Sequence, residues 1–230
     1  MHKKYRNTLF IFRRDLRVED NTGLNAAMRD SRQVTACFVF DDRQIKDNPY
    51  KGAAAYDFMI HSLIELKNAI AERKGTLHFF KGVAHEVVGK MLHAHAFDAV
   101  YVNEDYTPFS RARDNDIART CRQACIDFHT FSDALLTSPQ QATKGKGSPY
   151  RVFTAFYNRA RQIPVNLPST ESRHHYASAP LCGSIAFDTG IMTKPDAAGG
   201  RTQAMSILNR IEDFVRYADE KNIPALNGTT

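Results

Sequence analysis

Short apolar runs alternate with amphipathic stretches over the first 131 residues of the chain. Five of these runs are four to seven residues long and rich in aromatic and β-branched side chains, which predicts buried strands. They lie at Leu9–Phe12, Val34–Phe40, Leu77–Phe80, Ala99–Val102 and Ile126–Phe131.

Helical periodicity fills the intervals between these runs. A helix is expected to open at Asn21 or Thr22, and another carries an apolar stripe at spacings of three and four residues from Tyr56 to Ile70. Two more are expected at Val83–His95 and Ser110–Cys125. Strands that alternate with helices in this way predict an α/β fold with a doubly wound five-stranded parallel sheet, which is Rossmann-like.

Ligands of such sheets bind beyond the carboxyl ends of the strands. The polar segments that follow the first, second and fourth strands are therefore the candidates, at residues 13–17, 41–42 and 103–106. The chain has neither a G-x-G-x-x-G motif nor a P-loop, and its first glycine after the first strand is Gly23. A phosphate cradled by backbone amides is thus not expected at the first turn.

The first strand runs directly into a block of mixed charge, "RRDLRVEDN". Arg13, Asp15 and Arg17 can pair with one another, and Asp20 or Asn21 can cap the following helix. This block predicts an ion-pair and capping network that holds the corner between strand and helix.

The character of the chain changes after Phe131, where six prolines and loop-like segments follow as far as residue 200. One helix is expected within this part, at Tyr150–Gln162, and a second amphipathic helix runs from Arg201 to about Lys221. We therefore predict an α/β domain at 1–132, a linker at 133–200 and the start of a helical domain at 201–230.

Composition narrows the class of protein. With 43% hydrophobic and 24% charged residues the chain is typical of a globular protein, and neither a membrane-length apolar segment nor a signal peptide is recognisable, which predicts a cytoplasmic protein. The net charge of +6 suits a polyanionic partner such as nucleic acid, or simply a solvated basic surface. The four cysteines lack metal-ligand spacing and are expected to be free thiols, and no metal site is predicted.

Four segments resemble motifs of the photolyase and cryptochrome family, in the family's order. "FRRDLRVEDN" is similar to its first-strand signature, "YVNEDYTPFSRARD" to its fourth-strand segment and "SPYRVFTAFYNR" to its linker helix. "GGRTQAMSILNRI", with a later Tyr, Pro and "GTT", is similar to the opening of its helical domain. These motifs cover nearly the whole chain.

The resemblance implies an antenna chromophore, either a reduced folate (methenyltetrahydrofolate) or a deazaflavin. Asn103 and Glu104 match the pair that grips the pterin edge in folate-binding relatives, although a solvated strand end would look the same. Asp41, Arg13 and Asp15 are further candidates for the antenna cleft.

The resemblance also implies FAD in the helical domain, where Tyr217 and Thr229 match positions near the flavin and its phosphates, and Thr230 stands where the family usually has Ser. In the whole protein the antenna would pass light energy to FAD, which repairs a pyrimidine dimer flipped out of damaged DNA. The chain contains no tryptophan and only the start of that domain, so it is not expected to repair DNA alone.

Two other interpretations stay open at this point. The chain could be a free-standing chromophore- or nucleotide-binding module without catalysis, or part of a cryptochrome-type blue-light receptor that acts through partners. The oligomeric state is not predicted.

Overall fold

Five parallel strands form a single sheet in the computed structural model, which describes residues 3–45, 52–138, 140–144, 147–165, 167–169, 174–187 and 199–223. The order across the sheet is β3-β2-β1-β4-β5, and every pair is parallel. The strands are β1 (Tyr5–Phe12), β2 (Ser31–Phe40), β3 (Leu77–Lys81), β4 (Ala99–Asn103) and β5 (Asp127–Phe131). The predicted fold class is confirmed.

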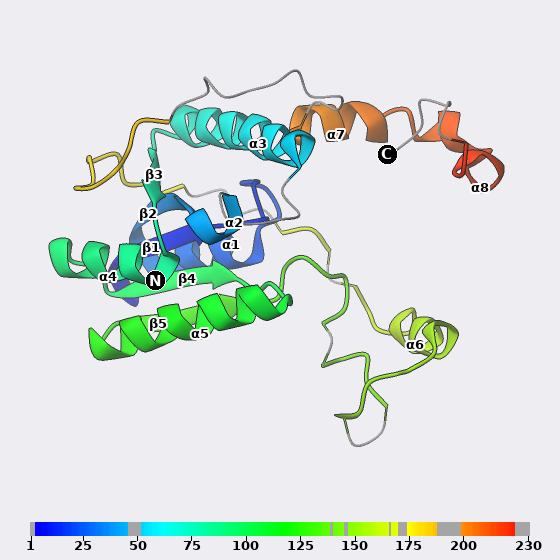
Figure 1. Ribbon diagram of the computed structural model, residues 1–230, viewed down its shortest axis with the longest axis horizontal. Coiled ribbons are helices and arrows are strands. Elements are labelled where there is room, and N and C mark those ends of the chain that lie inside the picture. The colour runs from blue at the N-terminus through cyan, green and yellow to red at the C-terminus, as the bar shows by residue number, and fades with distance from the viewer. Residues whose placement is uncertain are drawn as a thin grey trace.

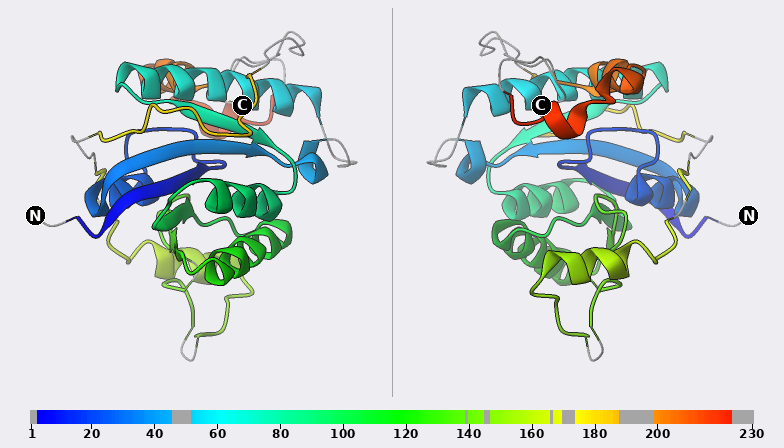
Figure 2. Two further views of the ribbon diagram at one scale, coloured as in Figure 1. Left: turned by 90° about the vertical axis from the view of Figure 1, so that its left-hand side faces the viewer. Right: turned by 90° about the vertical axis from the view of Figure 1, so that its right-hand side faces the viewer.

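Helices cover both faces of the sheet (Figures 1 and 2). Those of the α/β part are α1 (Thr22–Asp30), α2 (Asp42–Ile45), α3 (Ala53–Glu72), α4 (Ala84–Ala94) and α5 (Pro108–Gln123). Helices α1 and α3 pack on one face, and α4 and α5 pack on the other. The short helix α2 was not anticipated, because its four residues were taken as the polar end of a strand.

Strand β1 buries apolar side chains on both of its faces, as a strand at the centre of a covered sheet should. Phe10 and Phe12 belong to the core under α1 and α3, whereas Leu9 and Ile11 belong to the core over α4 and α5. Successive side chains of a strand point to opposite faces, so a continuous apolar run suits a sheet that is covered on both sides.

The segment 174–187 returns from the linker to the sheet and lies along its β3 side. The Ala177 N–H donates to the Val34 carbonyl at 2.8 Å, and the Ile185 N–H donates to the Phe79 carbonyl at 2.8 Å. The ring of Phe187 stacks on that of Phe79 with centroids 4.3 Å apart. This segment thereby covers a sheet edge that would otherwise expose unpaired backbone groups.

The C-terminal region differs from the single helix expected at 201–221. It consists of α7 (Arg201–Leu208), a 3-10 turn η2 (Ile211–Phe214) and α8 (Tyr217–Glu220). Ile211 and Val215 are 62% and 84% exposed. An amphipathic helix gains most of its stability by burying its apolar face, and these side chains lack that support. The linker helix α6 (Phe153–Ala160) is shorter than predicted and likewise has no buried residue.

Candidate functional site

A buried polar network fills the corner where β1 and β4 end. The Asn103 side-chain amide donates to Asp15 Oδ2 at 2.6 Å and to Asn21 Oδ1 at 2.7 Å, and its oxygen accepts the Gly23 N–H at 2.9 Å. Asp15 also accepts the Arg13 backbone N–H at 2.8 Å. Asn103 and Asp15, both candidates from the sequence, are brought together here, but their polar atoms are used within the protein.

The same network caps and seats helix α1. Asn21 is the N-cap, since its side chain accepts the Leu24 N–H at 3.0 Å, which confirms one of the two predicted caps. Only glycine fits at position 23, because a Cβ there would lie 2.6 Å from Asn103 Oδ1. The space beyond the carboxyl ends of the neighbouring strands β1 and β4 is thus filled by side chains of the protein and is not open to a ligand.

The arginines of the charged block do not pair with Asp15 as expected. Arg13 Nη1 donates to Asp114 of α5 at 2.7 Å, and Arg17 pairs with Asp133 at 2.9 Å. Both partners lie about 100 residues away in the chain, where local spacing could not reveal them. The prediction of an ion-pair network at this corner is correct, but the prediction of its partners is wrong.

A cavity of about 480 Å³ lies next to this network, on the β2 side of β1, beyond the carboxyl ends of β1 and β2. Its volume lies within the range of roughly 300–1,000 Å³ that is typical of small-molecule sites. One wall carries large apolar side chains from β2 and α3, and the opposite wall carries residues of α4 and α5. The first wall includes Phe38, Phe40, Tyr56 and Met59, and the second includes Ala84, Ser110, Arg113 and Ile117.

Charged groups lie at the sheet edge of this cavity. Arg13 and Asp41, predicted from the sequence, line it together with Asp105, which lies in the candidate segment 103–106. Arg113 also lines it and was missed by the sequence reading. Arg113 precedes Ile117 and Cys121 by four and eight residues, so it lies on the buried face of α5. In the sequence, Arg113 could have been recognised as a charged residue within the apolar stripe of a predicted helix.

The carboxylates of Asp41 and Asp105 accept hydrogen bonds from other side chains of the protein. Arg43 donates to both oxygens of Asp41, at 2.9 and 2.6 Å, and Ser110 Oγ donates to Asp105 at 2.9 Å. Burial of the Asp41 carboxyl acts to raise its pKa, but the hydrogen bonds from Arg43 outweigh burial and hold that pKa below its usual value. The Asp105 pKa is lowered in the same way, since the hydrogen bond from Ser110 and the charge of Arg14 together outweigh burial. Both groups are therefore carboxylates at neutral pH.

Glu104 lies apart from the cavity, on the β5 side of the sheet. Its carboxylate accepts hydrogen bonds from Tyr106 and Thr130, both at 3.4 Å, and it is only partly buried. The structure therefore separates Glu104 from Arg13 and Asp41, with which the sequence reading had grouped it.

The candidates for an FAD site are not assembled among the described residues. Tyr217 lies in the four-residue helix α8 with half of its surface exposed. Thr229 and Thr230 lie outside the described residues.

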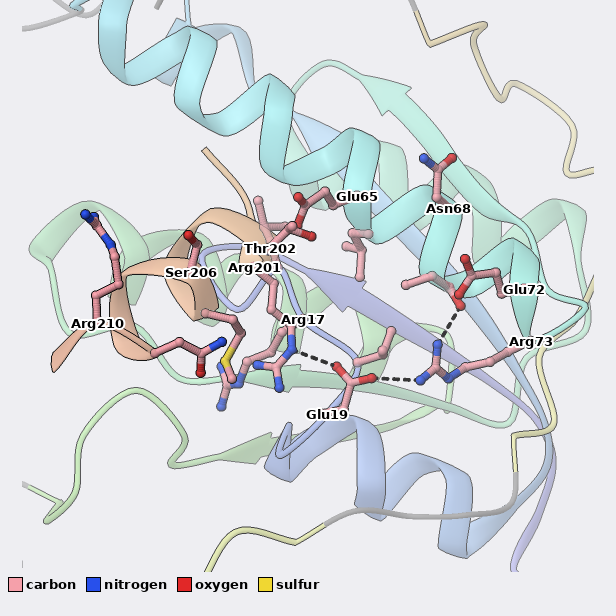
Figure 3. A pocket seen from close by; sticks show the side chains of 16 residues that line it. Arg17, Glu19, Glu65, Asn68, Glu72, Arg73, Arg201, Thr202, Ser206 and Arg210 are labelled. Atoms are coloured by element: carbon pink, nitrogen blue, oxygen red, sulfur yellow. Dashed lines mark hydrogen bonds and ion pairs between the residues drawn. The ribbon is translucent and has the colours of Figure 1, made fainter. Parts of the chain in front are cut away.

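A larger groove of about 900 Å³ lies between α3, the β1–α1 loop and α7 (Figure 3). Glu19 holds it together by pairing with Arg73 at 2.7 Å and with Arg201 at 3.3 Å. Among the described residues that line it, every buried side-chain nitrogen and oxygen has a hydrogen-bond partner. We therefore interpret the groove as the contact between α7 and the α/β part rather than as a ligand site.

Other classes of site find no support in the described part of the chain. Those residues contain no cluster of His, Cys, Asp or Glu that could hold a metal ion. Cys37 and Cys121 are buried, Cys125 and Cys182 are exposed, and all four are free thiols as predicted. None of the described helices has both the length and the apolar character that a membrane span requires.

Comparison with known proteins agrees with the fold. The sequence model of the family described as DNA photolyase matches residues 8–173. Since this match covers most of the chain, the protein belongs to the DNA photolyase family.

Two relatives show the extent of the likeness. An archaeal photolyase from Sulfolobus tokodaii, whose crystal structure holds two FAD molecules and implicates a novel light-harvesting cofactor, is 36% identical with a TM-score of 0.85 over 97% of this chain and 50% of its own. A deoxyribodipyrimidine photo-lyase from Synechococcus is 30% identical over 96% of this chain and 49% of its own. The chain thus spans about half the length of these photolyases.

A third relative is shorter. An uncharacterized 31.6 kDa protein from another Synechococcus strain is 29% identical, and the match covers 96% of this chain and 81% of that protein.

Proposed function

We propose that this chain is the antenna-binding portion of a light-driven DNA repair flavoprotein, and that the cavity at the ends of β1 and β2 takes a flavin or deazaflavin ring. The observation that carries the proposal is the cavity itself, which has an aromatic wall facing buried cationic groups. A planar ring with polar edges matches that combination of surfaces.

The features of the site favour this cavity over the end of β4. A folate held by Asn103 would compete with three short hydrogen bonds that Asn103 makes within the protein. Leaving a buried Asp15 carboxylate with fewer donors carries a substantial free-energy cost. A ring in the cavity leaves that network intact.

When bound, such a chromophore would absorb light and pass its energy to FAD in the whole protein. The residues of this chain would bind the ring, exclude water from it and fix its orientation. We assign no FAD site to the described residues, so repair of pyrimidine dimers in damaged DNA is proposed for the whole protein and not for this chain alone. The two FAD molecules and the novel light-harvesting cofactor named for the Sulfolobus tokodaii photolyase support a flavin as the kind of chromophore.

A free-standing chromophore-binding module is the second candidate. It is favoured by the 31.6 kDa relative, of which this chain covers 81%. Dimer repair by the protein under light, with FAD added, would reject it.

The first test is spectroscopic. The purified protein is titrated with riboflavin, 8-hydroxy-5-deazaflavin riboside and methenyltetrahydrofolate, and absorption and fluorescence report binding. We expect a flavin or deazaflavin to bind, and Ala55→Trp, which places a large ring at the lining of the cavity, to weaken that binding. Ala54→Trp is the matched control, because Ala54 is an exposed neighbour on α3 that does not line the cavity.

The alternative location has its own signature. If folate binds, and Glu104→Ala abolishes this binding while Ala55→Trp leaves it unchanged, the antenna lies at the end of β4. If none of the three ligands binds, this chain does not hold an antenna by itself.

A further inference from the structure

The positive charge of the chain is concentrated in its linker. Between Asp133 and Glu171 the sequence contains five lysines and arginines and no acidic residue, so this stretch carries five of the chain's six net positive charges. The five cations are Lys144, Lys146, Arg151, Arg159 and Arg161, of which Lys146 lies outside the described residues. A local excess of this kind is the electrostatic footprint of a polyanionic partner.

Three of these arginines lie at or beside helix α6, and their charges are unpaired. Arg151 precedes the helix, Arg159 lies in its last turn and Arg161 follows it, and all three are exposed. Within the described residues, none of the three side chains takes part in an ion pair or a hydrogen bond. In the α/β part, by contrast, Arg17 and Arg73 pair with carboxylates at 2.9 and 2.7 Å. The arginines of α6 are therefore available to an anion from outside the chain.

Exposed aromatic rings lie between these arginines. Phe153 and Tyr157 are 74% and 51% exposed, and their rings stack with centroids 6.0 Å apart. The ring of Phe156 lies 6.2 Å from that of Phe153. Since α6 has no buried residue and projects away from the sheet (Figure 1), these rings form an uncovered apolar surface.

Helical spacing places the rings and the charges next to one another. Phe153, Tyr157 and Arg161 follow each other at intervals of four residues, and Arg159 follows Phe156 by three. Side chains at these spacings are neighbours on a helix surface, about 5–6 Å apart. The helix thus presents aromatic and cationic groups side by side.

This combination distinguishes between kinds of partner. An apolar protein surface would cover the rings but leave the guanidinium groups without acceptors, and the loss of their water carries a free-energy cost. A single strand of nucleic acid supplies phosphate oxygens for the arginines and flat base faces for the rings. In a duplex the base faces are stacked on one another, so only the charges would be satisfied.

We infer that the arginine–aromatic surface of α6, formed by Arg151, Phe153, Tyr157, Arg159 and Arg161, binds single-stranded nucleic acid without regard to sequence. Bases stack on the two rings, and the arginines contact the phosphates on either side. This surface lies outside the cavity and needs neither chromophore nor light, so its role goes beyond the proposed function.

Fluorescence anisotropy in the dark, with no chromophore added, tests this binding. The probes are a labelled oligothymidylate of about 12 nucleotides, an oligouridylate of the same length and a duplex of the same length. We expect the single strands to bind more tightly than the duplex, and their affinity to fall as salt is raised, because bound counterions are released. The first two probes also show whether DNA or RNA is the preferred source of the strand.

Removal of the charges should reduce the salt dependence. The test variant carries Arg151→Gln, Arg159→Gln and Arg161→Gln, and we expect the slope of log K against log salt to become shallower by about 2. A control variant loses the same charge from exposed positions of α5, through Arg111→Gln, Arg119→Gln and Arg122→Gln. The control should keep both the affinity and the slope of the wild type.

Removal of a ring should weaken binding without changing the salt dependence. We expect Phe153→Ala to lower the affinity for a single strand by roughly 5- to 150-fold. Phe58→Ala is the matched control, because Phe58 is a 50% exposed phenylalanine on α3. Since α6 has no buried residue, its variants leave the core of the α/β part intact.

Three outcomes would overturn the inference. The first is that no single strand binds, or that both triple variants lose the same affinity. The second is that the duplex binds as tightly as the single strands and Phe153→Ala has no effect. The third is self-association of the protein that Phe153→Ala abolishes, with no strand bound, which would assign this surface to a second copy of the chain. None of these outcomes bears on the antenna, so the proposed function stands or fails separately.

Discussion

The α/β part and the C-terminal helices of this protein use similar apolar content in opposite ways. In the first, Leu63 and Ile70 of α3 are fully buried against the sheet. In the second, Leu208, Ile211 and Val215 are more than half exposed, and the predicted long helix is broken into α7, η2 and α8. An apolar stripe therefore predicts a stable helix only where another surface covers it.

The largest test of this contrast compares two leucines. We expect Leu63→Ala to lower the free energy of unfolding by about 3 kcal/mol, because it removes buried methyl groups and leaves a cavity in the core. Leu208→Ala in α7 should change it by less than about 0.5 kcal/mol, since Leu208 is 53% exposed. Urea unfolding followed by circular dichroism measures both. Equal losses would mean that α7 is as well packed as α3.

The next test concerns the polar corner of the α/β part. Asn103→Asp replaces an amide that donates to Asp15 at 2.6 Å with a second carboxyl, so like charges meet in a buried site. We expect a loss of about 2 kcal/mol in the free energy of unfolding at pH 7. The deficit relative to wild type should shrink in acid, when one of the two carboxyls takes up a proton.

Glu104→Ala is the matched control for this substitution, because Glu104 follows Asn103 directly but is only partly buried. Stability of Asn103→Asp equal to that of wild type at pH 7 would show that Asn103 is not the centre of the network.

We expect a smaller effect of pH on the free energy of unfolding. His78 of β3 is 3% exposed, and burial, with a minor contribution from His95, lowers its pKa. The unfolded histidine takes up a proton near pH 6.5, whereas the folded one does so only at lower pH. Between these two values the unfolded state binds more protons, so stability should fall as the pH decreases, by at most about 1.4 kcal/mol per pH unit.

Unfolding in urea at pH 7.5 and 5.5 measures this dependence. His78→Gln should make the decrease smaller, and His93→Gln, at an exposed position on α4, is the matched control. An unchanged decrease in His78→Gln would assign the acid sensitivity to other groups.

The smallest effect concerns the attachment of α7. Glu65 of α3 accepts the Thr202 N–H at 3.0 Å, and Gly200, at φ +108°, passes so close that a Cβ there would lie 2.5 Å from the Glu65 carboxyl carbon. We expect Glu65→Ala to change global stability by less than about 1 kcal/mol while it loosens the first turn of α7.

Limited trypsin digestion detects this change through faster cleavage at Arg201 and Arg210. Glu72→Ala, at an exposed position on the same helix, should leave the cleavage rate unchanged. Equal rates in wild type and Glu65→Ala would show that other contacts hold α7.

Much of the fold was predictable because it depends on local pattern. Apolar runs such as Leu9–Phe12 identified all five strands, and helix signals such as the Asn21 cap placed α1 correctly. The strand ends were less well predicted: β1 begins at Tyr5, four residues before its apolar run. Hydrogen bonding to β2 extends the strand where side-chain pattern gives no sign of it.

The candidate site was predicted only in part. Arg13 and Asp41 do line the cavity, because both follow strands whose carboxyl ends lie next to each other in the sheet. Arg113 was missed, since it lies within a helix and its importance comes from Asp114 and from the distant Arg13. Whether an antenna binds there stays a prediction.

Apolar periodicity and capping chemistry act over a few residues, so the sequence alone was sufficient for the order of elements, the parallel sheet and the corner at Asn21. The carboxylate partners of Arg13 and Arg17, and Asn103 as a donor to Asp15, lie about 90 to 120 residues away, so only the folded chain decides these contacts. The same holds for the cavity and for the exposed α7. Their existence depends on which surfaces meet in space, and the free energy of those contacts is not encoded in any one segment.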